Sequence, residues 1–493
     1  MSMIKVQDLT FSYPGSFDNI FEGVNFQIDT DWKLGFIGRN GRGKTTFFNL
    51  LLGNYEYSGK ILASVEFNYF PYPVADKNKF THEILEEICP QAEDWEFLRE
   101  ISYLNVDAEV MYRPFKTLSN GEQTKVLLAA LFLNEGQFLL IDEPTNHLDT
   151  DARKIVSDYL RKKKGFILIS HDRIFLDGCV DHILSINRAN IEVQSGNYSS
   201  WKLNFDRQQE YEEATNDRLQ KDIGRLKQSS KRSASWSHDV EASKNGTRNS
   251  GSKLDKGFVG HKAAKMMKRA KNLESRQQKA IEEKSKLLKN VEKTESLKLE
   301  ALKFKSNEFV TLADVSVTYD EQVVNEPINF VVEQGDRIVL DGKNGSGKSS
   351  ILKLILGYPI QQHTGLVTLG PGLTISYVQQ DTSHLKGSLS NFIEEHKIDE
   401  TLFKSILRKM DFDRVQFEKD IFYYSGGQKK KLLIAKSLCE KAHMYIWDEP
   451  LNFIDIYSRM QIEELIQQFN PTMIIVEHDK AFQQTVATIT ISM

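Results

Sequence analysis

Two glycine-rich stretches of this sequence end in a lysine followed by a hydroxyl residue, in the pattern GxxxxGK[ST]. They are GRNGRGKT at 38–45 and GKNGSGKS at 342–349, and the first follows an apolar stretch expected to be a buried strand. In such a loop the glycines let backbone N–H groups close around phosphate oxygens, and the lysine adds positive charge. The helix that follows adds the positive end of its dipole. The sequence therefore predicts two sites for nucleotide phosphates.

Each predicted phosphate site includes the loop and the first residues of the helix after it. Lys44 would pair with the β- and γ-phosphates, and Thr45 would hold Mg²⁺. The whole series of motifs is repeated at an offset of about 306 positions, so the chain is expected to be duplicated. The residues concerned are Gly38, Arg39, Asn40, Gly41, Arg42, Gly43, Lys44, Thr45 and Thr46 in the first half, and Gly342, Lys343, Asn344, Gly345, Ser346, Gly347, Lys348, Ser349 and Ser350 in the second.

A serine-led motif follows each loop and precedes a helical stretch. The motifs are LSNGEQ at 118–123 and YSGGQ at 424–428. An isolated motif of this kind has an ordinary explanation, because Ser119 and Glu122 stand at the spacing of a helix capping box. Both roles are compatible, since a helix N-terminus is also where a γ-phosphate can bind. The residues assigned to the binding role are Ser119, Asn120, Gly121 and Glu122, and Ser425, Gly426, Gly427 and Gln428.

Acidic pairs and histidines complete the repeated set. Each pair follows an apolar strand, and each histidine follows a later strand. The pairs are Asp142-Glu143 and Asp448-Glu449, and the histidines are His171 and His478. An acidic pair after a strand could be a solvated turn, but the same order in both halves favours a functional set. Residues 4–11, ahead of the first loop, alternate like an edge strand and lead to Tyr13.

This ordered set resembles an ABC-type ATPase domain, present twice. The resemblance implies head-to-tail pairing, in which the serine-led signature of each half caps the phosphate loop of the other. ATP would then close the pair, and hydrolysis would reopen it. It also implies roles for single residues: adenine stacking by Tyr13 and Tyr319, Mg²⁺ positioning by Asp142 and Asp448, polarisation of the attacking water by Glu143 and Glu449, and γ-phosphate contact by His171 and His478.

One position of the first half departs from the family pattern. The glutamine loop keeps its glutamine in the second half, as Gln380, whereas the first half has Tyr72 at that position. Tyrosine is a poorer ligand for Mg²⁺ or water, so metal coordination is expected to differ between the sites. The metal ligands expected in all are Thr45, Asp142, Ser349, Gln380 and Asp448.

The middle of the chain has a different composition. Residues 201–300 hold 24 lysines and arginines against 15 aspartates and glutamates, while the rest of the chain holds 40 against 53. One helix is expected from about 206 to 244 and a second from about 261 to 300, forming an antiparallel hairpin. Arms of this length would reach roughly 55 Å, at ~1.5 Å per residue.

Positive charge is concentrated near the expected hairpin tip at 245–260. A solvated helix face explains lysines in general, but phosphate neutralisation explains why they cluster at one end. The tip also carries a phenylalanine in a glycine-rich loop. This loop could simply be disordered, or the side chain could stack on a base or intrude into a pocket. The residues proposed to contact RNA or a drug site are Lys244, Phe258, Val259, Lys262, Lys265, Lys268 and Arg269.

Composition limits the remaining possibilities. No run of about 18 apolar residues is present, and the start of the chain lacks a signal pattern. Cys89, Cys179 and Cys439 lack metal-ligand spacing and are expected to be buried free thiols. The sequence predicts a cytoplasmic monomer of α/β class with no membrane or DNA partner: an ATPase domain at 1–200, a helical linker at 201–304 and a second ATPase domain at 305–493.

Two such domains in tandem with a linker of about 100 residues resemble the ABC-F family, and most of all its antibiotic-resistance branch of Lsa type. The resemblance implies an ATPase that binds the ribosome at the tRNA exit site, with 23S rRNA and P-site tRNA as partners. Its hairpin would act near the peptidyl-transferase centre to dislodge lincosamides, pleuromutilins and streptogramin A.

Two other functions stay open on the sequence alone. One is a housekeeping ABC-F translation factor that acts on stalled ribosomes without a drug. The other is the ATPase subunit of a drug exporter, which would need a membrane partner and has no need of the hairpin. In all three, ATP and Mg²⁺ are the cofactors.

Overall fold

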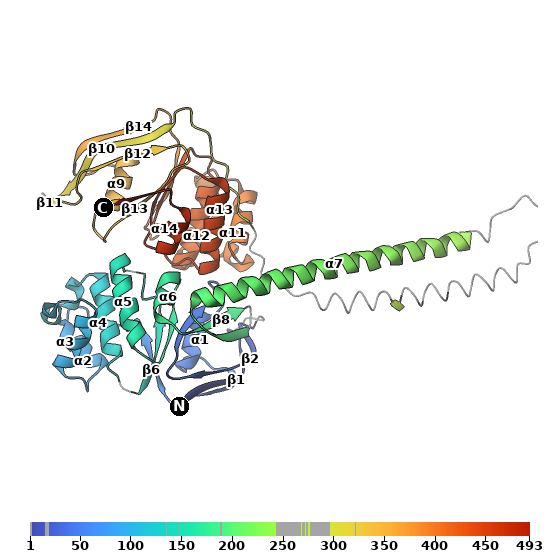
Figure 1. Ribbon diagram of the computed structural model, residues 1–493, viewed down its shortest axis with the longest axis horizontal. Coiled ribbons are helices and arrows are strands. Elements are labelled where there is room, and N and C mark those ends of the chain that lie inside the picture. The colour runs from blue at the N-terminus through green and yellow to red at the C-terminus, as the bar shows by residue number, and fades with distance from the viewer. Residues whose placement is uncertain are drawn as a thin grey trace, which may run out of the picture. The chain divides into compact units, whose positions relative to one another are not determined.

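The computed structural model describes residues 2–14, 19–134, 136–146, 148–187, 190–242, 268, 272, 275–276, 296–320 and 322–493. Contacts divide the chain into two compact units. One unit comprises Met1–Trp201 together with Thr294–Met493, and the other is Lys202–Lys293. Both predicted ATPase domains belong to the first unit, which we describe as two halves (Figure 1). Among the described helices, none is long and apolar enough to cross a membrane.

The first half begins with a small antiparallel sheet in the order β2-β1-β4. Its strands are β1 (Met3–Phe11), β2 (Phe21–Asp29) and β4 (Ser58–Leu62). The prediction that residues 4–11 form an edge strand is wrong, because β1 pairs with β2 on one side and β4 on the other. The alternation that suggested an edge reports only that one face is buried, as Ile4, Val6 and Leu9 are.

A largely parallel sheet forms the centre of the first half, in the order β5-β6-β7-β3-β8-β9. Its central strands are continuous apolar runs, as expected when helices cover both faces. Because the strands are parallel, their carboxyl ends meet at one edge, where ligands of such sheets bind. The strands are β3 (Lys33–Ile37), β5 (Glu66–Phe70), β6 (Gln137–Asp142), β7 (Phe166–Ile169), β8 (His182–Asn187) and β9 (Asn190–Ser195).

Helices surround this sheet and place the motifs. The phosphate loop runs into α1, the first signature opens α4, and α5 and α6 follow the acidic pair and the histidine. The helices are α1 (Lys44–Leu51), α2 (Thr81–Ile88), α3 (Asp94–Tyr103), α4 (Asn120–Leu131), α5 (Thr150–Lys162) and α6 (Arg173–Cys179), with 3-10 turns η1 (Ala108–Tyr112) and η2 (Phe115–Thr117).

The second half repeats this plan, as the sequence predicts. Its antiparallel sheet contains β10 (Glu308–Tyr319), β11 (Gln322–Val323), β12 (Ile328–Glu333) and β14 (Gln362–Leu369). Its parallel sheet has the order β15-β16-β17-β13-β18. Those strands are β13 (Arg337–Asp341), β15 (Ile375–Val378), β16 (Met444–Asp448), β17 (Met473–Val476) and β18 (Ile489–Ser492).

The helices of the second half also follow the first. They are α9 (Lys348–Ile355), α10 (Leu389–Glu395), α11 (Glu400–Lys409), α12 (Gly426–Cys439), α13 (Ile456–Phe469) and α14 (Lys480–Val486), with 3-10 turns η4 (Arg414–Glu418) and η5 (Ile421–Tyr423). The thiols are free: Cys89 and Cys179 are buried as predicted, whereas Cys439 is only half-buried.

The linker agrees with the prediction in its first arm. Helix α7 spans Tyr198–Ala242, so it begins eight residues before the predicted start. The predicted second helix does not extend to Glu300, because residues 296–304 are neither helix nor strand. Leu297 and Leu299 are instead buried in the core of the second half. Their burial explains the error: these leucines, two residues apart, pack into the core of the second half and do not continue a helical stripe.

Candidate active sites

The first glycine-rich loop joins strand β3 to helix α1. Gly43 has a φ of +96°, which disfavours any side chain, and a Cβ there would lie 2.5 Å from the Cγ2 atom of Ile20. Lys44 is buried, and its ammonium donates to the carbonyl oxygens of Gly38 at 2.7 Å and Arg39 at 3.1 Å. Burial lowers the pKa of Lys44, against the pull of nearby carboxylates. The loop thus holds one positive charge at the amino end of α1.

The second loop has the same geometry. Gly347 has a φ of +89°, and the Lys348 ammonium donates to the carbonyl oxygens of Gly342 at 2.8 Å and Lys343 at 2.7 Å. Burial lowers the pKa of Lys348 as well. Two loops therefore offer backbone N–H groups, a helix dipole and a lysine, the combination that binds phosphate.

Next to each loop, a hydroxyl lies against the carboxylate that ends the following central strand. Thr45 Oγ1 donates to Asp142 Oδ2 at 3.0 Å, and Ser349 donates to Asp448. Within the described residues, Asp448 Oδ1 is buried without a hydrogen-bond partner. Burial raises the pKa of Asp448 to about 6. This oxygen-only pair fits Mg²⁺, which is usually held by one or two carboxylates together with substrate phosphates.

The two halves differ at the glutamine-loop position. Gln380 lines the second cavity, while Tyr72 is not among the residues that line the first. Another tyrosine, which the sequence analysis did not single out, reaches the first site: the Tyr69 hydroxyl donates to Asp142 Oδ2 at 3.2 Å. Burial and the charge of Asp142 raise the pKa of Tyr69, so the phenol stays protonated. In the first site the Tyr69 phenol is therefore hydrogen-bonded to one carboxylate oxygen of Asp142, the predicted metal ligand.

The predicted catalytic glutamates have an unusual backbone conformation in both halves. The φ angle is +49° at Glu143 and +45° at Glu449, a region that few residues with side chains adopt. Each amide donates to the neighbouring strand at 2.9 Å, to the carbonyl of Ile169 or Val476. Such strain is typical of functional positions. Burial, and then the charge of Asp142, raises the pKa of Glu143 to about 8.

His171 belongs to a chain of contacts that joins the two halves. Its Nε2 lies 3.3 Å from Glu143 Oε1 and 3.2 Å from Asn40 Oδ1. The Asn40 amide nitrogen donates to the Phe453 carbonyl of the other half at 2.7 Å. That bond fixes the orientation of the amide, so the Asn40 oxygen must accept a hydrogen bond from His171 Nε2–H. Burial, with the charge of Lys44, holds the pKa of His171 well below 6.5, so the ring is neutral.

Each phosphate loop shares a cavity with the signature of the opposite half. The first cavity, of about 440 Å³, contains Tyr13, Asn40, Gly41, Gly43, Lys44, Thr45, Thr46, Asp142, Glu143 and His171 together with Ser425, Gly426, Gly427 and Phe453. The second, of about 940 Å³, contains Lys343, Asn344, Gln380, Glu449, Asn452 and His478 together with Ser119, Asn120, Gly121 and Glu122. This is the head-to-tail arrangement that the sequence predicts.

The signatures are also helix caps, as the alternative explanation proposed. Ser119 Oγ accepts from the Glu122 amide at 3.2 Å, and the Glu122 carboxylate accepts from the Ser119 amide at 2.8 Å. Ser425 and Gln428 form the same capping box. At Gly427, a Cβ would lie 2.4 Å from the Phe453 carbonyl oxygen. A side chain there would push away the carbonyl that Asn40 contacts.

Several interdomain contacts have no signal in the sequence. The arginines of the first loop, expected near phosphate, direct their side chains to the other half: Arg39 lies 3.9 Å and Arg42 lies 3.6 Å from Asp411. Arg173 forms a two-pronged ion pair with Glu463, with one contact at 3.0 Å. These partners are separated by hundreds of residues, so no spacing rule could link them.

The proposed adenine-stacking tyrosines occupy equivalent places. Tyr13 hydroxyl lies 2.7 Å from Thr46 Oγ1, and Tyr319 hydroxyl lies 3.2 Å from Ser350 Oγ. Tyr13 is 40% exposed, which leaves ring surface available to a base. Stacking itself stays a prediction.

Most of the predicted linker contacts cannot be placed. Lys244, Phe258, Val259, Lys262, Lys265 and Arg269 lie outside the described residues. Lys268 is helical and exposed.

Loop, acidic pair, histidine and opposing signature together define an ABC-type ATPase with two composite sites. The family described as ABC transporter matches residues 21–146 and 325–452. The chain belongs to this family of ATP hydrolases, and within it to the ABC-F group, as predicted.

Named relatives extend over almost the whole chain. The ribosome protection protein VmlR of Bacillus subtilis is 29% identical, over 96% of this chain and 83% of its own. ABC transporter F family member 2 of Arabidopsis thaliana is 24% identical, over 98% of this chain and 75% of its own.

Solved structures show the same fold. The archaeal ribosome recycling factor aABCE1, solved with the ribosomal stalk protein aP1, has a TM-score of 0.63 at 17% identity, covering 98% of this chain and 87% of that one. A structure described as RNase-L Inhibitor has a TM-score of 0.62 at 17% identity, covering 99% and 87%.

Proposed function

We propose that this protein binds the ribosome when ATP closes its two halves, and that it protects the ribosome from antibiotics that act at the peptidyl-transferase centre. The observation that carries the proposal is a basic stretch inserted in the sequence between the two halves that form the ATP sites, of which Lys202–Lys293 is a separate compact unit. An ATPase alone has no need of such a unit. A relative described as a ribosome protection protein, similar over nearly the full chain, supports the same conclusion.

The ATP cycle would act on the interface between the halves. A γ-phosphate bound at Lys44 also meets Ser425 and Gly427 of the other half, so bound ATP links the two. Bound Mg²⁺ would neutralise charge on the transferred phosphoryl group and be held by Thr45 and Asp142, or by Ser349, Gln380 and Asp448. After hydrolysis the shared γ-phosphate is gone, and the halves separate. Release from the ribosome would follow.

The linker would provide the contact with RNA in the cytoplasm. Its excess of lysine and arginine favours phosphate backbones, because each contact releases a counterion. We propose that the protein binds at the tRNA exit site and that its linker contacts 23S rRNA and P-site tRNA. Action on lincosamides, pleuromutilins and streptogramin A is part of the proposal and is carried by family resemblance.

Drug susceptibility tests the protective role. We expect a susceptible bacterium that expresses the protein to tolerate higher concentrations of these drugs, and a Lys44→Ala, Lys348→Ala variant to give no tolerance. Full tolerance from a variant that cannot bind ATP would contradict the proposal. Ribosome binding without any tolerance would favour the housekeeping translation factor. Tolerance that depends on a membrane partner would favour the exporter subunit.

Replacement of Phe258 by alanine tests the linker tip. We expect Phe258→Ala to lower drug tolerance and to leave ATPase activity within about twofold of the parent, because the residue lies far in sequence from both ATP sites and would stack at the RNA target. Leu254→Ala, four residues away and not among the proposed contacts, is the control for simple loss of apolar surface. Unchanged tolerance in Phe258→Ala would remove this side chain from the mechanism.

A further inference from the structure

A buried lysine lies behind the second ATP site and has no role in the phosphate loop. Lys430 is in the first turns of α12 and is 2% exposed. Its ammonium donates to the carbonyl oxygen of Gln379 at 2.8 Å and to that of Asp448 at 3.2 Å. Burying an ammonium is costly unless its protons are used. Here they join two backbone segments that no sequence motif connects.

Both segments carry side chains of the second site. Asp448 ends strand β16, and its carboxylate accepts from Ser349. Gln379 immediately precedes Gln380, which lines the ATP cavity with Glu449. The two hydrogen bonds of Lys430 therefore connect the glutamine loop with the end of strand β16. These two segments carry the predicted metal ligands Gln380 and Asp448.

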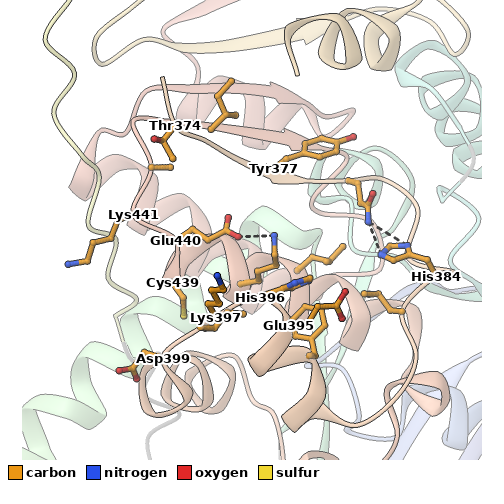
Figure 2. Close-up of a pocket in the computed structure, with 18 of the residues that line it drawn as sticks. Thr374, Tyr377, His384, Glu395, His396, Lys397, Asp399, Cys439, Glu440 and Lys441 are labelled. Carbon is orange, nitrogen blue, oxygen red and sulfur yellow. Dashed lines mark hydrogen bonds and ion pairs between the residues drawn. The ribbon is translucent and has the colours of Figure 1, made fainter. Parts of the chain in front are cut away.

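The glutamine loop is held from its other side as well. The side-chain amide of Gln379 lies 2.7 Å from His384 Nε2. Both residues line a separate pocket of about 760 Å³, where Figure 2 labels His384 and Tyr377. Gln379 is thus fixed through its side chain at this pocket and through its carbonyl by Lys430. The orientation of the next residue, Gln380, depends on both.

We propose that Lys430 is a positioning residue of the second ATP site, which holds Gln380 and Asp448 at a fixed separation so that both can serve one metal–nucleotide complex. The inference rests on the ATPase activity of the chain and is independent of ribosome binding.

The duplicate half supports a specific role. Counting from the signature serines, Lys430 corresponds to Thr124, and the next residue is lysine in both halves, Lys431 and Lys125. Threonine has neither the length nor the charge to join two strand ends in this way. The first site instead has the Tyr69 hydroxyl on Asp142. The two sites therefore fix their acidic residue by different means, and only the second has a glutamine to position.

The surroundings of Lys430 keep it protonated near neutral pH. Burial lowers its pKa to about 8, while the charges of Asp448, Glu449 and Glu477 oppose that shift. The ammonium also offsets carboxylate charge beside Asp448. Removing it would take a donor from the buried carbonyl group of Asp448 and from the partly buried carbonyl group of Gln379, which costs more than losing an exposed hydrogen bond.

Replacement of Lys430 by methionine tests the proposal. We expect kcat for ATP to fall about 10- to 100-fold, in the range that misplacement of a site by about 1 Å produces. KM for ATP should stay within about twofold, because Lys348 and the loop are untouched. The Mg²⁺ concentration that gives half-maximal binding of a fluorescent ATP analogue should rise at least about threefold.

Two matched controls separate positioning from general damage. Lys429→Met removes a charge one residue away, where the ammonium lies 5.8 Å from the Phe422 ring, and should leave kcat and the Mg²⁺ requirement within about twofold. Thr124→Met places the same side chain at the duplicate position and should also leave the Mg²⁺ requirement within about twofold. If Lys430→Met does not fold, Lys430→Gln is the alternative variant, because its shorter, neutral side chain keeps an NH₂ donor. It should show the same rise in the Mg²⁺ requirement.

Either of two results would overturn the proposal. The first is an unchanged kcat and Mg²⁺ requirement in a folded Lys430 variant. The second is a loss of ATP binding and of thermal stability with no change in the Mg²⁺ requirement, because that pattern belongs to a purely structural lysine.

Discussion

ATP turnover by the Glu143→Gln, Glu449→Gln double variant is expected to fall by about 10²–10⁴, the contribution typical of a general base. Glutamine has nearly the shape of glutamate but cannot accept a proton from water. Both glutamates immediately follow buried strands beside a phosphate loop, in the same strained backbone conformation. ATP binding should persist, because Lys44 and Lys348 are unchanged. Steady-state phosphate release and equilibrium nucleotide binding measure the two effects separately.

The same variant should stay closed around ATP and bind ribosomes. We expect it to co-sediment with ribosomes when ATP is present and to remain in the supernatant without nucleotide. A Lys44→Ala, Lys348→Ala variant is the control, since it cannot hold the phosphates that join the halves. Absence of ATP-dependent co-sedimentation would end the ribosome proposal while leaving the ATPase assignment intact. Comparison of the two single glutamate variants would show which site turns over faster.

The parts of the sites that the sequence predicts are those determined by neighbours along the chain. Gly43 needs a positive φ for the loop to turn into α1. Ser119 caps α4 together with Glu122, which lies three residues further along the chain. Such constraints act over a few residues, so they leave spacings that can be recognised. Head-to-tail pairing was predicted only by resemblance, because nothing local to Ser425 indicates that it faces Lys44.

The parts that the sequence does not predict depend on long-range packing. Tyr69 contacts Asp142 across 73 residues, and Lys430 contacts Gln379 across 51 residues. Neither Tyr69 nor Lys430 stands in a motif that indicates its partner. The place of β1 between two partners depends on which strands return to it, while its alternation records only one buried face. Helix α7 begins at Tyr198, before the change in composition from which its start at about 206 was predicted. A change in composition therefore does not mark the first residue of this helix.

Stability of the second half is expected to depend on one buried ion pair at the start of α13. Lys431 Nζ lies 2.8 Å from Asp455 Oδ2, and both side chains are almost fully buried. The Asp455→Asn variant should lose about 3–5 kcal/mol, because Lys431 would be left buried without its counter-charge. Helix capping should survive, since asparagine caps as well as aspartate. A fall in the midpoint of thermal or urea unfolding at pH 7 measures the loss.

The pH dependence identifies the cause of that loss. Burial alone would raise the pKa of Asp455, but the charge and hydrogen bond of Lys431 hold it well below 3.8. A depressed pKa gives stability that is present above the unfolded value and is lost as pH falls towards the folded value. The difference between parent and variant should therefore be full at pH 7 and shrink below about pH 4.

The duplicate residue provides the control. Asp149 caps α5 in the same way and is partly exposed, and its carboxylate forms no ion pair within 4 Å among the described residues. Asp149→Asn should therefore cost less than about 1 kcal/mol, since the cap is kept. Equal losses in the two variants would mean that capping, and not the ion pair, stabilises these helices. The buried charge of Lys431 would then have to be stabilised by the Met410 carbonyl, its other acceptor at 2.8 Å.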